Sequence, residues 1–329
     1  MATDETSATS NRRWRFGPGI AILNRIERLS ETQFVYLMLT PVLLLLGTMA
    51  IWPLLYTANI SLHADSITTA NPVGEFVGLQ NYMDLLTGQA DVILQRPFLD
   101  LNQPFKSAVP VTMLFTVGAI VIETVLGFAM ALVLDQRFRG RKLVRVGLII
   151  PWAVPIVIQG MIFYLMFQPS IGFAVEPLHQ MGLISASPLA TSHDALLITI
   201  VADIWKQSAF MALLILAGLQ SIDRSLYQVA KISGASKWQQ FRTITFPLVL
   251  PTLLVALLFR TIAAVKVYGT IETISSCNTV PSLSCLVVSM WNASRYGSAA
   301  AIAFIIAATI GVLLIVYLIQ FRKQESMGV

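Results

Sequence analysis

The chain has 329 residues, of which 56% are hydrophobic and only 12% are Asp, Glu, Lys or Arg. Soluble globular domains contain roughly 25% charged residues, so this composition excludes an ordinary soluble enzyme and indicates a protein that lies in a lipid bilayer. The formal net charge of +5 does not indicate a nucleic-acid partner, because the basic residues are spread between apolar segments. The two cysteines are too few for a disulfide framework, and no metal site is expected.

A helix that crosses the hydrocarbon core of a membrane needs roughly 20 predominantly apolar residues. Six such runs follow an N-terminal arm that we place at residues 1–33. Because backbone groups in lipid must pair within the chain, we expect each run to form a helix and the whole fold to be all-α. The transmembrane domain then covers residues 34–321, before a tail at residues 322–329. The expected spans are 34–55, 109–134, 144–167, 195–219, 247–268 and 299–321.

The positions of the basic residues predict how the chain is oriented in the membrane. The arm, the second and fourth loops and the tail hold 16 of the 22 Lys and Arg residues, and the other three loops hold only Arg96, Lys106 and Arg295. Lys and Arg are retained on the cytoplasmic side, so we expect both termini to be cytoplasmic. On the external side, residues 75–86 of the longest loop are expected to form a short amphipathic helix.

The fourth loop, residues 221–246, is long for a connection between packed helices, which usually takes about 2 to 8 residues. We expect Asp223 to cap a short helix with apolar residues at helical spacing, which Ser233-Gly234 interrupts. A second short helix is expected from Ala235 to the start of the fifth span at Pro247. The periodicity fits an amphipathic hairpin that rests on the membrane as well as a structured surface for a partner.

Residues 227–248 resemble the cytoplasmic loop signature of the permeases of binding-protein-dependent ABC importers, in which Glu-Ala-Ala is followed by a glycine and then by Ile and Pro. Gln228 replaces the usual glutamate, and Ser233 replaces an acidic residue that often precedes the glycine. The resemblance covers most of the chain outside residues 1–31 and the loop around residues 277–285. The matching segments are Gln228-Val229-Ala230, Gly234-Ala235-Ser236, Trp238, Phe241, Ile244 and Pro247-Leu248, together with residues 76–82 (FVGLQNY), 148–151 (LIIP) and 204–206 (IWK), which are similar to the carbohydrate-type permeases.

The resemblance implies the type I permease fold of these importers, with six transmembrane helices. It also implies that the first short helix of the fourth loop is a coupling helix seated in a cleft of a separate ATP-hydrolysing subunit. The sequence contains no G-x-x-x-x-G-K-[ST] phosphate loop, so ATP and magnesium belong to that partner, and we expect no cofactor and no covalent chemistry in this chain. The residues implied in coupling are Tyr227, Gln228, Val229, Ala230, Ser233, Gly234, Ala235 and Trp238.

The same resemblance implies the partners and the cargo. The partners are a second homologous permease, a dimer of ATP-binding subunits and an extracellular solute-binding protein. The cargo is a sugar or a related solute, such as a di- or oligosaccharide or a glycosylated compatible solute. The protein would then form part of the translocation path across the plasma membrane of a prokaryote.

Polar residues inside the spans are costly in lipid and usually face the bundle interior or a water-filled path. Asp203 and Lys206 lie three residues apart on one helical face, so an internal ion pair and a contact with the substrate are equally good interpretations. Arg260, in the middle of the fifth span, is a candidate partner for Glu123. Aromatic rings and amides near the external ends of the spans suit a sugar, although Trp and Tyr commonly form an interfacial belt instead. The candidates for the substrate path are Glu123, Asp203, Trp205, Lys206, Gln207, Arg260, Lys266, Tyr268, Trp291 and Asn292.

The two cysteines, Cys277 and Cys285, lie in one external loop with seven residues between them. A disulfide that closes this small loop can form in an oxidising compartment, and the alternative is a pair of free thiols. We favour the disulfide, because two otherwise absent cysteines fall together on the oxidising side.

An ion-coupled secondary carrier is the alternative class, because Glu123, Asp203 and Lys206 are ionisable residues within spans and such residues relay ions in carriers. The structured fourth loop and the lack of an evident inverted repeat favour the importer. An intramembrane enzyme is disfavoured, because the three histidines lie in external loops and the sequence has no H-E-x-x-H motif.

Overall fold

The computed structural model describes residues 30–66 and 73–326. Most of the expected N-terminal arm, and residues 327–329 of the expected tail, lie outside the described residues. The described residues are mostly helical, which confirms the all-α class. The chain divides into two compact units, residues 1–57 and 58–329, and each is described by itself.

The first unit contains one long apolar helical segment. α2 (Glu31–Leu46) begins with a capping box, in which the Ser30 hydroxyl accepts a hydrogen bond from the Gln33 N–H at 3.3 Å and the Gln33 side chain accepts one from the Ser30 N–H at 3.2 Å. A π-helical turn (Gly47–Ile51) leads into α3 (Trp52–Ser61), which continues into the second unit. The segment, residues 31–61, contains an 18-residue stretch with a mean hydropathy of 2.2 and is long enough to cross a membrane. It contains the first expected span.

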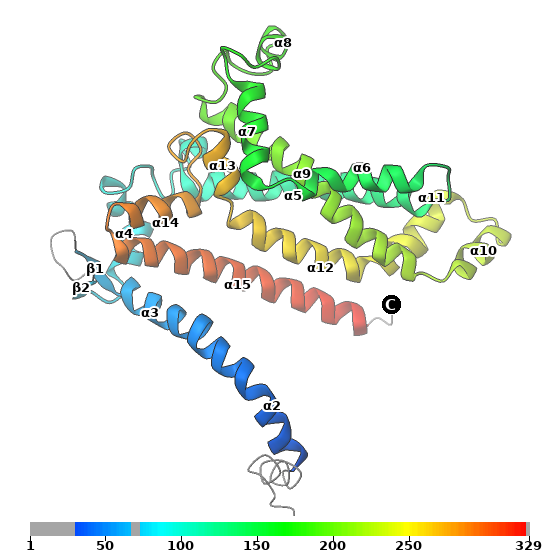
Figure 1. Cartoon of the computed structure of the whole chain (residues 1–329), viewed down its shortest axis with the longest axis horizontal. Helices are drawn as coiled ribbons and strands as arrows, with labels where there is room; N and C mark the ends of the chain where they lie inside the picture. The colour runs from blue at the N-terminus through cyan, green and yellow to red at the C-terminus, as the bar shows by residue number, and fades with distance from the viewer. Residues whose placement is uncertain (1–29, 67–72, 327–329) are drawn as a thin grey trace, which may run out of the picture. The chain divides into compact units, whose positions relative to one another are not determined.

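Long helices that lie side by side form the bundle of the second unit (Figure 1). α5 (Ala108–Asp135) and α9 (Ser192–Ser221) pack along their length, α12 (Phe246–Val265) packs against both, and α15 (Tyr296–Ser326) packs along α12. Gly127 of α5 allows α5 and α9 to approach closely, because an added Cβ there would lie 2.6 Å from the Cβ of Met211 on α9. These helices contain the second, fourth and sixth expected spans, whereas α12 covers the fifth only as far as Val265, short of the expected end at residue 268.

The third expected span, residues 144–167, is not one straight helix. α6 (Arg141–Ala153) and α7 (Ile156–Phe167) are bent by 91° at Val154-Pro155. Proline disfavours helical backbone in the residue before it, and Val154 accordingly has an extended ψ of 129°. In the described residues, five helices are long and apolar enough to span a membrane, or six if the bent pair forms one span.

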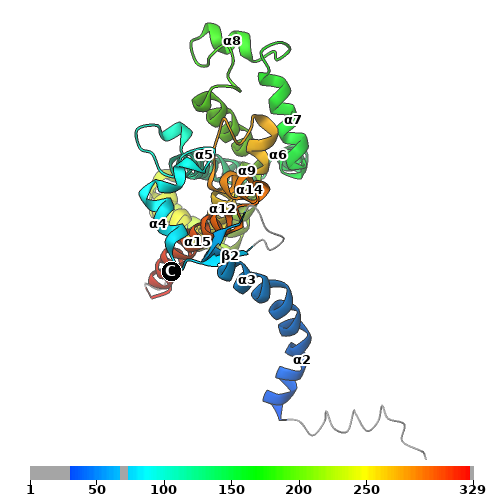
Figure 2. The same cartoon turned by 90° about the vertical axis from the view of Figure 1, so that its left-hand side faces the viewer.

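The two ends of the bundle carry different short elements (Figures 1 and 2). At the end that we call the α10 end, α10 (Arg224–Ile232) and α11 (Lys237–Gln240) follow α9, and a π-helical turn (Phe241–Thr245) leads into α12. α8 (Val175–Gln180) lies beyond α7, away from both ends. The opposite end, which we call the α14 end, holds β1 (His63–Asp65), β2 (Val73–Phe76), α4 (Gln80–Thr87), the 3₁₀ turns Gln89–Val92 and Pro104–Lys106, α13 (Gly269–Ile274) and α14 (Leu283–Asn292).

The amphipathic helix expected over residues 75–86 starts later than predicted. Its first residues belong to β2, which pairs antiparallel with β1 so that Phe76 lies opposite His63, and α4 begins only at Gln80. The Asn81 amide donates to the carbonyl oxygens of Ser61 at 2.9 Å and His63 at 2.8 Å. The strand pairing and these hydrogen bonds join residues that are not neighbours in the sequence. The local pattern of apolar residues therefore did not reveal β2.

Candidate functional site

The sequence pointed to three sets of residues, which the structure places in different parts of the second unit. The first set lies on α10 and α11 at the α10 end. α10 begins at Asp223, whose carboxylate accepts a hydrogen bond from the Ser225 N–H at 2.9 Å, and this bond lowers the pKa of Asp223. The local sequence therefore starts this helix where it was expected.

The corner after α10 is made by Gly234, which has a φ of +79°. The Ala235 N–H bonds to the Ala230 carbonyl at 2.9 Å and the Gly234 N–H bonds to the Lys231 carbonyl at 3.1 Å, which is the Schellman arrangement that ends a helix. Glycine adopts this left-handed backbone without the steric cost that other residues meet. The corner thus sets the direction of α11.

α11 is held on the bundle rather than free. Ser236 and Gln239 form a capping box, with the Gln239 side chain accepting the Ser236 N–H at 2.7 Å. The rings of Trp238 and Phe241 stack with centroids 5.5 Å apart, and Phe241 also meets Phe128 of α5 at 5.5 Å. These contacts join the loop to α5 and to the start of α12.

α10 is fastened to the bundle by two further contacts. The Arg224 guanidinium donates to both carboxylate oxygens of Asp135, at the end of α5, at 2.8 and 2.5 Å. This carboxylate raises the pKa of Arg224 above its usual value. The hydroxyl of Tyr227, which is half-buried, lies 3.0 Å from that of Thr245. A movement of α10 would therefore act on both α5 and α12.

The other coupling candidates divide into packed and exposed side chains. Val229 is 62% exposed and Trp238 68%, although both are apolar, and Ile232, which was not among the candidates, is 88% exposed. Gln228 and Ser233 are also exposed, whereas Ala230 and Ala235 are half-buried. The loop therefore presents an apolar surface of the kind that a partner protein covers.

The second set is a buried group of charges between α5, α9 and α12. Arg260 donates from Nε to Glu123 Oε2 at 2.6 Å, from Nη2 to Glu123 Oε1 at 2.8 Å, and from Nη2 to Asp203 Oδ2 at 2.6 Å. Glu123 is 0% exposed and Arg260 3% exposed. Two carboxylates thus share one guanidinium, and the charged groups of the three side chains are directed at one another.

Lys206 does not form the ion pair with Asp203 that was one interpretation of their spacing. Its ammonium group donates instead to the carbonyl oxygen of Val154, the residue at the bend between α6 and α7. Lys206 thus supplies a donor to a carbonyl at the point where the helix is interrupted. The spacing along α9 gave no sign of this contact, because Val154 lies 52 residues earlier in the sequence.

The remaining candidates in the spans are scattered. Trp205 is 39% exposed and its ring lies 5.9 Å from that of Phe163 on α7. Gln207 is half-buried on α9, and Lys266 is exposed just after α12. Gln159 of α7 is a buried polar residue that the sequence analysis missed: its Nε2 donates to the Ala202 carbonyl at 2.6 Å, and its Oε1 has no partner in the described part of the chain. The signal in the sequence that could have identified Gln159 is a single amide side chain within an apolar run.

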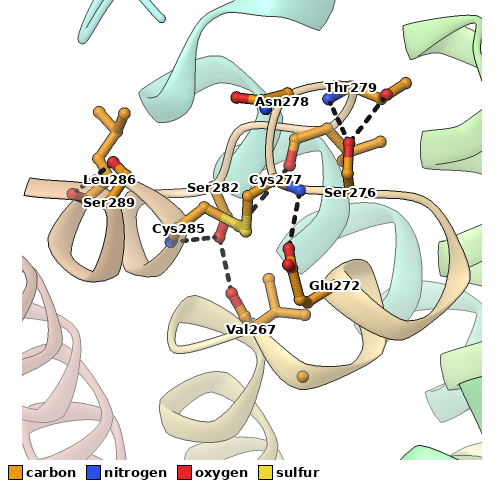
Figure 3. Close-up of a disulfide and its surroundings, with 12 residues drawn as sticks. Val267, Glu272, Ser276, Cys277, Asn278, Thr279, Ser282, Cys285, Leu286 and Ser289 are labelled. Atoms are coloured by element: carbon orange, nitrogen blue, oxygen red, sulfur yellow. Dashed lines mark hydrogen bonds between the residues drawn. A yellow bond between two sulfur atoms is a disulfide. The ribbon is translucent and has the colours of Figure 1, made fainter. Parts of the chain in front are cut away.

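The third set lies around a disulfide at the α14 end (Figure 3). Cys277 and Cys285 are bonded to each other, with their Cα atoms 5.4 Å apart. The Glu272 carboxylate accepts a hydrogen bond from the Cys277 N–H at 3.0 Å. The Ser282 hydroxyl accepts one from the Cys285 N–H at 3.1 Å and donates to the Val267 carbonyl at 2.7 Å. The loop between α13 and α14 is therefore held at both of its ends.

A polar hollow of about 400 Å³ lies beside this disulfide. It brings together Tyr268 and Asn292 from the predicted substrate path, whereas the charged group at Arg260 and the residues Trp205 and Gln207 do not line it. Hollows of roughly 300–1,000 Å³ with an aromatic wall and a few polar groups are typical of small-molecule sites. Its other polar lining residues, which the sequence analysis did not single out, are Gln95, Glu272, Ser276, Asn278 and Ser289.

A structured loop on a bundle of membrane helices suits a transport subunit, and comparison with known proteins decides the family. The model of the family described as binding-protein-dependent transport system inner membrane component matches residues 123–325. The chain belongs to this family. It is therefore a multi-pass permease component of an ABC transporter, as its resemblance to these permeases implied.

Two relatives and one solved transporter illustrate this membership. The chain is 35% identical to the trehalose/maltose transport system permease protein MalF of Thermococcus litoralis, over 89% of this chain and 96% of that protein. It is 28% identical to the trehalose transport system permease protein SugA of Mycobacterium tuberculosis, over 92% of this chain and 93% of that protein. Its fold matches that of a bacterial ABC transporter that imports alginate, with a TM-score of 0.67, 20% identity and coverage of 92% of this chain and 99% of the other. The type I permease fold is thereby confirmed.

Proposed function

We propose that this permease forms part of the translocation path of an ATP-driven importer for a sugar or a related solute. The relatives named for trehalose and maltose support this cargo class. No lysine or arginine lines the polar hollow at the α14 end, within the part of the chain that the structure describes. Hydroxyl, amide and carboxylate groups around the Tyr268 ring suit a neutral, hydroxyl-rich solute better than an anionic one.

The observation that carries the proposal is the construction of the α10–α11 loop. Its exposed apolar side chains offer a surface for an ATP-binding subunit, and Arg224 and Tyr227 fasten α10 to α5 and to the start of α12. Closure of the ATP-binding subunits would then displace these helices together. A ligand that favours one of two packed arrangements of a bundle drives such a rocking motion.

In this proposal ATP and magnesium bind to the partner subunits, and this chain carries out no covalent chemistry. An extracellular solute-binding protein delivers the cargo, and a second homologous permease completes the path. Both the arm and the tail then lie in the cytoplasm, on the same side as α10, and the disulfide lies on the external side. An oxidising external compartment suits a disulfide at that end.

The experiment that tests the proposal is the purification of the tagged chain in mild detergent, followed by mass spectrometry of the proteins that accompany it. We expect a subunit with an ATP-binding phosphate loop and a second permease. The complex should take up radiolabelled trehalose or maltose into proteoliposomes only with ATP and its binding protein present. Uptake by the chain alone, driven by an ion gradient, would instead support the secondary carrier that uses Glu123, Asp203 and Lys206.

A further inference from the structure

A second hollow, at the α10 end, has a very different lining. It has a volume of about 360 Å³ and is lined by Asp135, Arg137, Arg141, Gln220 and Arg224. Three guanidinium groups and one carboxylate leave a net charge of +2 in this hollow. Both oxygens of that carboxylate, Asp135, already accept hydrogen bonds from Arg224. Among the described residues, Arg137 and Arg141 have no ion-pair partner.

The start of α6 lies at the same hollow, because Arg141 is the first residue of this helix. α6 begins at Arg141, and Gly140 before it provides no side-chain cap for the first N–H groups of the helix. A helix N-terminus carries partial positive charge and favours acidic residues, yet this first turn is basic. The Nε atoms of Arg141 and Arg145 are buried and have no hydrogen-bond partner in the described part of the chain. The net charge of the hollow, the uncapped basic start of α6 and the unpartnered Nε of Arg141 thus point to the same missing group, an anion with several oxygen atoms.

We propose that this hollow binds the phosphate of an anionic phospholipid headgroup. Guanidinium groups pair with phosphate through two parallel hydrogen bonds, and Arg137 and Arg141 are available for that pairing. The net charge of +2 favours a headgroup that is itself negatively charged. In a zwitterionic lipid, the positive group of the headgroup cancels the charge of the phosphate. Basic pockets at the ends of membrane helices are known to favour anionic headgroups.

The surroundings of the hollow favour a lipid over a free phosphate ion. The hollow lies where the apolar run of α5 ends, which is where a membrane surface would lie. Apolar side chains within one turn of its lining residues are exposed: Val133 is 51% exposed, Phe138 39% and Leu143 78%. A phospholipid would cover these side chains with its acyl chains while its phosphate entered the hollow, whereas a free ion would leave them uncovered.

The position of the site links it to the α10–α11 loop. Arg224 lines the hollow and is also the residue that fastens α10 to α5. A bound headgroup would add a second anionic partner for Arg224 and so stabilise the first turn of α10 on the bundle. This consequence rests on the proposed coupling role, whereas the lipid site itself does not.

The test measures lipid binding to the purified full chain with its accompanying subunits. Native mass spectrometry with added phosphatidylglycerol gives a dissociation constant, and phosphatidylcholine serves as the neutral comparison. Each basic residue near an anionic lipid contributes enough for about a fivefold change in affinity, so the double variant Arg137→Gln/Arg141→Gln should bind roughly 25-fold more weakly. Arg139→Gln is the matched control, because Arg139 lies in the same turn but does not line the hollow; it should bind within about twofold of the parent.

Four results would overturn the proposal. They are unchanged binding by the double variant, equal loss in Arg139→Gln, displacement of phosphatidylglycerol by inorganic phosphate at equal concentration, and binding by the isolated chain that disappears in the assembled complex. The last result would mean that an acidic partner protein fills the hollow. If the double variant does not fold, Arg137→Gln alone is measured, because Arg137 has no ion-pair partner in the described structure; a loss below twofold there would also overturn the proposal.

Discussion

At the scale of single residues, Arg260 has the greatest structural consequence of the candidates in the spans. Its side chain compensates two buried carboxylates, Glu123 and Asp203, from two neighbouring helices. Removing one partner from a buried ion group leaves an uncompensated charge, which costs more than the group as a whole contributes. Arg260 is therefore a residue whose loss should affect assembly of the bundle before it affects any contact with a solute.

Replacement of Arg260 by Leu is expected to destabilise the protein by about 3–5 kcal/mol, because Glu123 and Asp203 would remain buried without their cation. Thermal unfolding in detergent, followed by fluorescence, measures this change. Lys266→Leu is the control, since Lys266 is exposed and should change stability little. Equal melting temperatures for Arg260→Leu and the parent protein would show that the ion group does not stabilise the fold.

Gly234 acts at the same scale through its backbone. Its φ of +79° is costly for a β-branched residue, and no atom lies within 4 Å of an added Cβ, so Gly234→Val would alter the corner without a clash. We expect the variant to reach the membrane and to lose most of its uptake. Gly182→Val is a matched control, because Gly182 has a φ of +71° and equally open surroundings but lies outside the α10–α11 loop. Loss of uptake in both variants would point to general strain instead.

At the scale of elements, α10 exposes apolar side chains on one side and packs against the bundle on the other. Its apolar side chains face outward at Val229 and Ile232, while Tyr227 on its other side packs into the bundle. An exposed apolar surface of this kind marks a site where a protein or a membrane makes contact. In the proposed function, this exposed face is the surface on which the ATP-binding subunit docks.

Ile232→Asp is expected to release the ATP-binding subunit from the purified complex, because a carboxylate would be desolvated in an apolar contact. The amount of that subunit that co-purifies with the tagged chain measures the effect, and we expect at least a tenfold decrease. Leu183→Asp provides the control at an exposed apolar residue, 60% exposed, outside the loop. Full recovery of the subunit with Ile232→Asp would contradict a docking role for this face.

The loop between α13 and α14 is the second element with a distinct role, because its disulfide fixes one side of the polar hollow. Replacing both cysteines by Ser should destabilise the protein by about 2–3 kcal/mol, as for other disulfides that close short loops. The looser wall should also raise the KM for uptake more than it lowers the maximal rate. If the KM equals that of the parent protein with its intact disulfide, the hollow does not lie on the path of the solute.

At the scale of the whole molecule, the fold places the α10–α11 loop and the disulfide at opposite ends of the same bundle. The basic residues predict that the α10 end is cytoplasmic. Helices such as α5 and α9, which extend between the two ends, connect them mechanically. A permease that responds to ATP-binding subunits at one end and to a solute at the other needs such a connection.

This orientation is testable with cysteines introduced at exposed positions. In intact cells, a membrane-impermeant maleimide should label Asn292→Cys, at the exposed end of α14, and should label Ser225→Cys, on α10, only after the membrane is opened. Both side chains are polar and lie at opposite ends of the bundle, and the native cysteines are unreactive while they are bonded to each other. Labelling of Ser225→Cys in intact cells would reverse the predicted orientation.

The sequence by itself determined the class of the protein, most of its spans and the form of the α10–α11 loop. Apolar runs of this length are helical in lipid whatever surrounds them, and local signals such as Asp223, Gly234 and Ser236 act within one turn of backbone. The tertiary structure alone decided that Lys206 bonds to the bend at Val154, that Arg260 is shared by two carboxylates and that Tyr268 and Asn292 meet at one hollow. Those contacts join residues from different helices, and helical periodicity shows which face a residue occupies but not which helix that face will meet.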